Sequence, residues 1–181
     1  MKKQLAMSLL FASTYFLQGC YGQENSDSNT LSRQEINDPD FIADWLRSHE
    51  HIDQTMAKHL FEQGMKEKQR KAWSSASKYF GESMIRYPRP EALSAYTDVK
   101  LQMLAMVRKR EGDIQEKLPL DMNNALKLYR SALSANTVLG TLSDEEKKRI
   151  QGHVDCLQAY AASGGPDIDC QPLHWYYNAA R

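Results

Sequence analysis

Residues 73–88 are WSSASKYFGESMIRYP, and this stretch decides the fold class of the chain. Its apolar side chains recur every three or four positions, as on one face of a helix: Trp73, Ala76, Phe80, Met84 and Tyr87. Pro88 and Pro90 follow at once, and the residue before a proline is biased away from the α conformation. The stretch therefore predicts one amphipathic helix of about 15 residues.

A second helical pattern lies upstream of this stretch. Asp38 followed by Pro39 is typical of a helix start, because the aspartate can cap the helix and proline suits the first helical position. Apolar residues then recur at helical spacing as far as Phe61, with a polar interruption at residues 48–51. This pattern leaves open one long helix or two helices that meet near Ser48. The charged run at residues 66–71 is interpreted as a solvated helix end.

Together the two patterns resemble one tetratricopeptide repeat. The match consists of a large residue, two small residues, an aromatic residue and a closing proline at the family's positions: Leu60, Gly64, Ala76, Phe80 and Pro88. In that family, small residues let two antiparallel helices approach closely, and the aromatic residue fills the gap to the next pair. Glu67 stands where the family has an aromatic residue in the first helix. A generic antiparallel helix pair is the alternative.

Downstream, a helix is predicted from Pro90 to Glu111, with Gly112 as its C-cap. Residues 112–119 are predicted to be a linker, after which Asp121 would cap a helix at residues 122–135. Ala125, Tyr129 and Ala132 in that helix resemble the second helix of a tetratricopeptide repeat. They also resemble the related Sel1 repeats, which tolerate longer insertions.

Ser143 and Glu146 form a capping-box pattern that should open a further helix, ending at Gly164. Within it, Glu145 and Arg149 have the spacing of an ion pair. The aromatic tail after Cys170 is expected to cover this last helix, because a terminal repeat exposes an apolar face. The expected fold is all-α, a short stack of about five or six helices in antiparallel pairs like a tetratricopeptide or Sel1 solenoid, without a sheet.

The N-terminus indicates the compartment. Lys2 and Lys3 precede an apolar run over residues 5–17, which has the length of a signal-peptide core. The tetrad Leu17-Gln18-Gly19-Cys20 at its end resembles the lipobox of bacterial lipoproteins, apart from Gln18 at a position where a small residue is usual. The resemblance implies a signal peptide at residues 1–19 and lipid attachment at Cys20. An ordinary cleaved signal and an uncleaved amphipathic start are the alternatives.

The lipobox divides the rest of the chain. Residues 20–37 are the lipidated cysteine and a flexible linker, since residues 22–30 have almost no side chain to bury. Residues 38–181 are then the helical domain. Tyr21 follows the cysteine where an aspartate could stand, and in enteric-type lipoproteins that pattern implies the outer membrane. The expected location is the periplasmic face of that membrane.

Charge and cysteine content agree with an envelope protein. The chain has 23 basic and 23 acidic side chains, and cleavage would remove Lys2 and Lys3, leaving 21 against 23. So small a net charge argues against a nucleic-acid partner. Once Cys20 carries lipid, Cys156 and Cys170 remain as a pair in an oxidising space, and a disulfide between them is expected. A buried thiol beside an unrelated exposed one is the alternative.

The sequence offers no strong catalytic motif, and we expect neither an enzyme nor a cofactor or metal. One histidine cluster could share a helix face: His49, His51, Asp53 and His59. We interpret it as solvated residues at a helix break, since a metal site needs three or four converging ligands. Four aromatic residues could line a peptide or glycan groove, but their helical spacing is more typical of a core: Tyr79, Phe80, Tyr87 and Tyr96.

The remaining hypothesis concerns binding. A helical stack leaves a concave face that packing does not use, and its first helices should present outward side chains there: Gln63, Lys66, Asp98 and Gln102. The expected function is a protein-interaction adaptor or scaffold in an envelope assembly, such as a secretion, pilus or barrel-assembly machine. The alternative is an envelope hydrolase or a peptidoglycan-binding accessory protein, using the histidine cluster or the aromatic groove.

Overall fold

A computed structural model describes residues 30–49, 54–163 and 170–180, and in these ranges the chain is all helical, as predicted. The helices are α1 Arg33–Ile36, α2 Pro39–Ser48, α3 Gln54–Gln69, α4 Trp73–Arg86, α5 Pro90–Glu111, α6 Ile114–Leu139, α7 Asp144–Ser163 and α8 Gln171–Ala180. The predicted signal peptide, Cys20 and residues 20–29 of the linker lie outside the described residues, as do His51 and Asp53. The prediction of a flexible linker is wrong for residues 30–37, because they contain α1 and bury Leu31 and Ile36 in the core. None of the described helices is long and apolar enough to cross a membrane.

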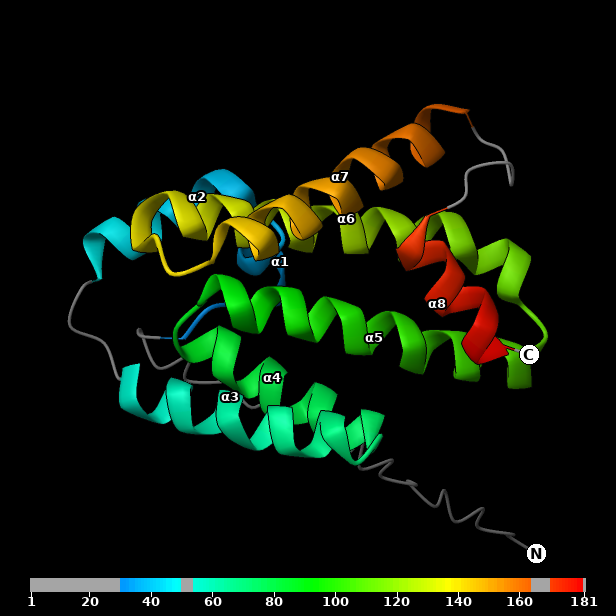
Figure 1. Ribbon diagram of the computed structural model, residues 1–181, viewed down its shortest axis with the longest axis horizontal. Coiled ribbons are helices and arrows are strands. Elements are labelled where there is room, and N and C mark those ends of the chain that lie inside the picture. The colour runs from blue at the N-terminus through cyan, green and yellow to red at the C-terminus, as the bar shows by residue number, and fades with distance from the viewer. Residues whose placement is uncertain (1–29, 50–53, 164–169, 181) are drawn as a thin grey trace, which may run out of the picture.

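The helices form antiparallel neighbours along the chain. In Figure 1, α3, α5 and α7 run in one direction, and α4 and α6 return between them. Each of these helices packs against the next, α2 packs against α6, and α8 crosses α5. The contact of α2 with α6 joins distant parts of the chain, with the Ser134 hydroxyl donating to the Pro39 carbonyl. In a strictly linear repeat array, each unit contacts only its neighbours in the chain. The contact between α2 and α6 is therefore an addition to the pattern of such an array.

Most predicted helix ends are confirmed. The Asp38 carboxylate accepts hydrogen bonds from the backbone amides of Asp40 and Phe41, at 3.1 and 3.2 Å, and so caps α2. Because α2 ends at Ser48 and α3 begins at Gln54, the two-helix alternative is the one observed. Gly112 ends α5 in the left-handed conformation, at φ 74°, where glycine carries no Cβ penalty. The capping box also forms, since the Glu146 amide donates to the Ser143 hydroxyl at 3.2 Å and the Ser143 amide donates to the Glu146 carboxylate at 3.0 Å.

The prediction of a linker at residues 112–119 is wrong. Helix α6 begins at Ile114 and continues through Pro119, so Asp121 is an interior helical residue and not a cap. A proline inside a helix costs about 3 kcal/mol. The burial of Leu118 and Met122 on either side of Pro119 offsets this cost, because packing of an apolar face contributes most of a helix's stability in a protein.

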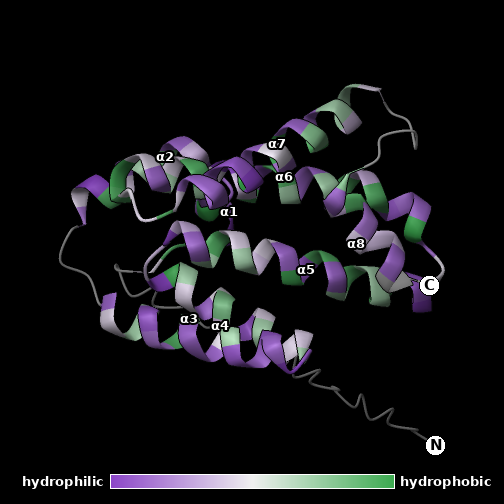
Figure 2. Cartoon of the chain, viewed as in Figure 1, coloured by the Kyte–Doolittle hydropathy of each residue, from purple (hydrophilic) through white to green (hydrophobic). Residues whose placement is uncertain are grey.

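The core runs along both sides of α5. One apolar cluster joins α1, α2, α4 and α6, a second joins α5 to α6, α7 and α8, and a smaller one lies between α4 and α5. Figure 2 shows that hydrophobic and hydrophilic residues mix on every helix, α5 included, as expected for amphipathic helices around a shared interior.

The close approach expected of α3 and α4 is confirmed. Gly64 is buried on α3, and Phe80 of α4 is fully buried against it. A Cβ atom at Gly64 would lie 2.5 Å from two ring carbons of Phe80. The small residue and the aromatic residue of the repeat pattern therefore hold this helix pair together as a matched set.

Gly64→Ala should destabilise the protein by up to about 2 kcal/mol, because overpacking costs about 1–3 kcal/mol and the gain in helix propensity returns only about 1 kcal/mol. Gly152→Ala is the matched control, because nothing lies within 4 Å of its would-be Cβ on α7. That variant should gain up to about 1 kcal/mol. Urea unfolding measures both changes, and equal stabilisation of the two variants would contradict the close packing.

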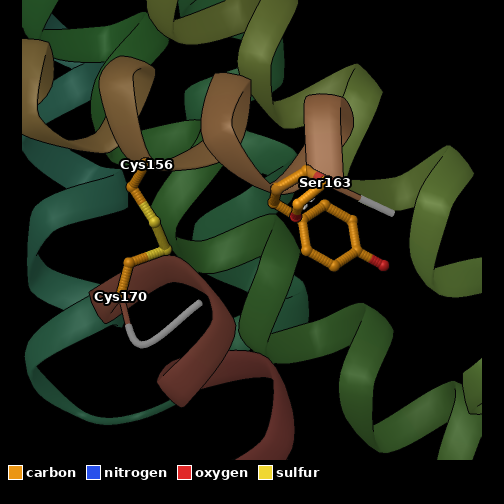
Figure 3. The surroundings of a disulfide bond; sticks show 4 residues. Cys156, Ser163 and Cys170 are labelled. Carbon is orange, nitrogen blue, oxygen red and sulfur yellow. Dashed lines mark hydrogen bonds between the residues drawn. A yellow bond between two sulfur atoms is a disulfide. The ribbon is translucent and has the colours of Figure 1, made fainter. Parts of the chain in front are cut away.

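The tail packs on a second helix besides the one expected. Helix α8 packs chiefly on α5, and it also contacts α7, where the rings of Trp175 and His153 lie edge to face with centroids 5.4 Å apart. The disulfide between Cys156 of α7 and Cys170, which immediately precedes α8, connects the two, with Cα atoms 6.1 Å apart, as in ordinary disulfides (Figure 3). The predicted cysteine pairing is thus observed, and the tail contacts the last helix as predicted, although most of its packing is on α5. Tyr176 explains the placement, because it is fully buried in the cluster that α5 shares with α6.

Candidate functional site

A groove lies between the three helices that run in the same direction. Its pocket has a volume of about 110 Å³ and is lined by residues of α3, α5 and α7 and the segment before α7: Phe61, Met65, Lys68, Glu91, Ser94, Ala95, Asp98, Leu142, Glu146, Arg149 and Ile150. The apolar members supply the wall, and charged residues of both signs surround them. We call this feature the α3/α5/α7 groove.

Asp98 of α5 is the centre of the groove. It is 5% exposed, and its two oxygens accept hydrogen bonds from two neighbouring helices and form an ion pair with a third. The Tyr129 hydroxyl of α6 donates to Oδ1 at 2.7 Å, Arg149 Nη1 of α7 donates to Oδ2 at 3.3 Å, and Lys68 Nζ of α3 lies 3.7 Å from Oδ2. One carboxylate thus connects α3, α5, α6 and α7.

Arg149 also contacts two other polar side chains. Its Nη2 donates to the Ser94 hydroxyl at 2.8 Å, and its Nη1 lies 3.2 Å from His153 Nε2. Burial lowers the pKa of His153, although the Asp98 charge opposes this shift, and the nearby Arg149 charge adds to it. Burial likewise raises the pKa of Tyr129, and Asp98 raises it further, so the phenol stays protonated and remains a donor.

This arrangement suits binding better than proton transfer. Both oxygens of Asp98 are already engaged, and the phenol that faces them is held in its protonated form. A general base must come within hydrogen-bond reach of the proton it takes, and a carboxylate that is 5% exposed offers little access to a substrate. Asp98 therefore shapes the groove and positions the cations around it.

The structure separates the four residues predicted to face a partner. The expectation that Asp98 points to solvent is wrong, because its carboxylate is buried among the three donors. Gln102 lies one turn beyond Asp98 on the same stripe of α5. Gln63 and Lys66 are partly or fully exposed, but neither is part of the pocket's lining, and their spacing places them away from the Phe61–Met65–Lys68 face.

Sequence reasoning missed the partners of Asp98. Arg149 was expected to pair with Glu145, but its guanidinium donates to Asp98 and Ser94, which are remote in sequence. Ion pairs between distant helices leave no periodic signal in a single sequence. One clue was present, since Asp98 directly follows Thr97 and lies three positions before the apolar Leu101 on the same predicted helix.

Asp121 of α6 is a second buried carboxylate with the same types of partner. Arg108 Nε donates to its Oδ2 at 3.1 Å, and the Tyr176 hydroxyl donates to the same oxygen at 3.0 Å. The hydrogen bond that Arg108 donates to Asp121 raises the pKa of Arg108, and burial, followed by the bond to Asp121, raises the pKa of Tyr176. Asp121 therefore connects α5, α6 and α8, away from the groove.

The histidine cluster and the aromatic groove have less support in the structure than the α3/α5/α7 groove has. The His49 ring stacks on Trp45 with centroids 4.6 Å apart, and its Nδ1 lies 2.9 Å from the Trp45 carbonyl oxygen. His59 is exposed, and the described part of the chain has no group of three residues placed to hold a metal ion. Phe80 and Tyr87 are buried in the core, and Tyr79 and Tyr96 are partly buried.

No family model matches the chain, and neither a curated protein nor a solved structure matches it significantly.

Proposed function

We propose that this protein is a lipid-anchored adaptor that binds a protein partner in the α3/α5/α7 groove and performs no chemistry. The observation that supports this most is the groove itself, where side chains of three parallel helices meet around a fully engaged carboxylate. In repeat proteins the first helices of successive pairs line the concave binding face. We propose the same role for α3, α5 and α7, in a tetratricopeptide-like or Sel1-like arrangement.

The groove also limits what the partner presents. Its volume of about 110 Å³ is below the roughly 150 Å³ of a cavity that takes benzene, so it suits one aliphatic side chain. Lys68, Glu91, Glu146 and Arg149 provide charges of both signs around it. The expected partner segment has an aliphatic anchor flanked by charged residues of both signs.

The proposed location is the periplasmic face of the outer membrane, with attachment through Cys20. Cys20→Ser should abolish incorporation of labelled palmitate and release the protein from the membrane fraction. The variant lacks the thiol that receives the lipid, so no acyl chain remains to hold it on the bilayer. Cys156→Ser is the matched control and should keep the label. Label that persists in Cys20→Ser, or that is absent from the native protein, would contradict the lipoprotein proposal.

Groove binding is tested with two charge-altered pairs. Met65→Lys with Glu91→Lys places charge in the pocket and reverses its rim, and it should reduce partner recovery in crosslinked membrane pull-downs by at least about tenfold, since buried unmatched charge costs several kcal/mol. Gln63→Lys with Lys66→Glu alters the other face of α3 and should leave recovery unchanged.

Both pairs are compared by mass spectrometry at equal protein levels, after circular dichroism has shown equal helicity. Full recovery with the groove pair would remove the groove from consideration. Loss only with the Gln63 and Lys66 pair would move the binding face to the outer side of α3.

A further inference from the structure

A second pocket lies on the other side of α5 and has a different character. Its volume is about 170 Å³, and it is enclosed by α1, α4, α5 and α6. The α5 residues that line the groove are Glu91, Ser94, Ala95 and Asp98. The α5 residues that line this second pocket are Tyr96, Thr97, Lys100, Leu101 and Leu104. At 100° per residue these two sets occupy roughly opposite faces of α5, so the sites are separate. We call this second feature the α1/α5 pocket.

The α1/α5 pocket is apolar inside and polar at its edge. Ile36, Met84 and Leu101 in its wall are at most 5% exposed. Arg33 at the edge is exposed, and Lys100 is half-buried. A concave apolar site with a few convergent polar groups is the usual form of a small-molecule site.

The charges in this pocket favour an anion. Among the described residues, no carboxylate forms an ion pair with Arg33 or Lys100. The only acid in the described lining is Asp121, whose charge is matched by Arg108 at 3.1 Å. Burial lowers the pKa of Lys100 and the neighbouring Arg33 charge adds to this shift, whereas the Asp121 charge opposes it without reversing it. A bound anion would oppose both effects, so it would be stabilised by two cations that form no ion pair with an acidic residue of the described protein.

One more polar atom points to the form of the ligand. Asn37 Oδ1 is buried and has no hydrogen-bond partner, whereas its Nδ2 donates to the Arg33 carbonyl at 2.8 Å. Buried acceptors are nearly always satisfied, so this oxygen lacks a donor. A hydroxyl or ammonium group on a ligand would supply it.

We propose that the α1/α5 pocket binds a small organic carboxylate with an aliphatic side chain and a hydrogen-bond donor beside the carboxylate. Arg33 and Lys100 pair with the carboxylate, and the apolar wall takes the side chain. Asn37 Oδ1 accepts from the donor on the α-carbon. The size agrees, because a cavity of about 150 Å³ takes benzene, and a leucine side chain is smaller than that ring. α-Hydroxy acids and α-amino acids share this chemistry.

The test uses full-length protein in detergent, with calorimetry and ligand-observed NMR on leucine, leucic acid (its α-hydroxy analogue), isocaproate and leucinamide. Leucine or leucic acid should bind more tightly than isocaproate, which lacks the donor, and leucinamide, which lacks the anion, should not bind. The stronger of the first two identifies the source of the ligand. Absence of binding by both at millimolar concentration, or equal binding of leucinamide, would overturn the proposal.

Variants locate the site independently of the ligand series. Lys100→Met and Arg33→Met should each weaken binding by about tenfold or more, as expected for loss of a charge-assisted hydrogen bond. Lys127→Met is the control, because Lys127 is an exposed lysine of α6 outside the pocket lining. Affinity that is unchanged in Lys100→Met and Arg33→Met would place binding elsewhere and overturn the assignment. Inorganic phosphate that binds as tightly as leucic acid would also overturn it, since the apolar wall would then contribute nothing.

Discussion

Asp98→Ala is expected to destabilise the protein by about 3 kcal/mol, the lower end of the range for breaking a buried ion pair by removing one partner. The Tyr129 side chain is fully buried and cannot turn to water, so its hydroxyl would lose its acceptor. Lys68 and Arg149 keep 31% and 36% side-chain exposure, which lets them recover part of their hydration. Their partial exposure is why the upper end of the range is not expected.

Urea unfolding followed by circular dichroism measures this loss. Asp44→Ala is the matched control, because Asp44 also pairs with an arginine, at 2.6 Å from Arg47 Nη1, but its side chain is 79% exposed. Exposed pairs contribute about 0–1 kcal/mol, so this variant should stay close to wild type. Tyr129→Phe, alone and combined with Asp98→Ala, completes a double-mutant cycle and isolates the hydrogen bond. A loss below about 1 kcal/mol for Asp98→Ala would show that the carboxylate does not connect the helices.

The repeating patterns of the sequence predicted the helices well. Local signals were sufficient at Asp38, Gly112, Ser143 and Pro88, because caps and prolines act on adjacent backbone groups. Gly64 and Phe80 were also predictable, because a repeat family supplied the expectation of close contact. These elements depend on few residues at short range.

The errors arose where tertiary packing outweighed local preference. Pro119 suggested a linker, but burial of Leu118 and Met122 carries α6 through it. The same error made Asp121 a cap, when it is buried against Arg108 and Tyr176. The tail was expected to cover only the apolar face of α7, whereas α8 packs mainly on the central α5 and reaches α7 through the disulfide and Trp175. None of these contacts is encoded by spacing.

The candidate site was predicted only in outline. A concave face formed by the first helices was expected, and the α3/α5/α7 groove corresponds to it in position. The residues differ, because helical spacing alone does not show which polar residue has a partner on another helix. Asp98 was therefore placed outward, and Lys68 and Arg149 were not considered as its partners.

The disulfide carries the second large expected effect. Replacing Cys156 and Cys170 together by serine should destabilise the protein by about 3 kcal/mol, since the cross-link closes a loop with a sequence separation of 14 residues and removes its closure entropy from the unfolded chain. The loss should be global and not confined to the tail. Tyr176 of α8 fills the same core as Leu101 and Met122 and donates to Asp121, so an untethered α8 exposes the second cluster.

Reduction separates the cross-link from the substitution. A reductant should lower the urea midpoint of the native protein to that of the double serine variant, and it should leave that variant unchanged. Thiol labelling of the unreduced, denatured protein should find neither Cys156 nor Cys170 free. Tyr176→Phe distinguishes tether from packing, because it keeps the ring and the disulfide and removes only the bond to Asp121. Tyr176→Phe should lower the free energy of unfolding by about 1 kcal/mol. If Tyr176→Phe and the double serine variant lost the same free energy, the stabilisation would belong to the Asp121 contact, and the tether would be contradicted.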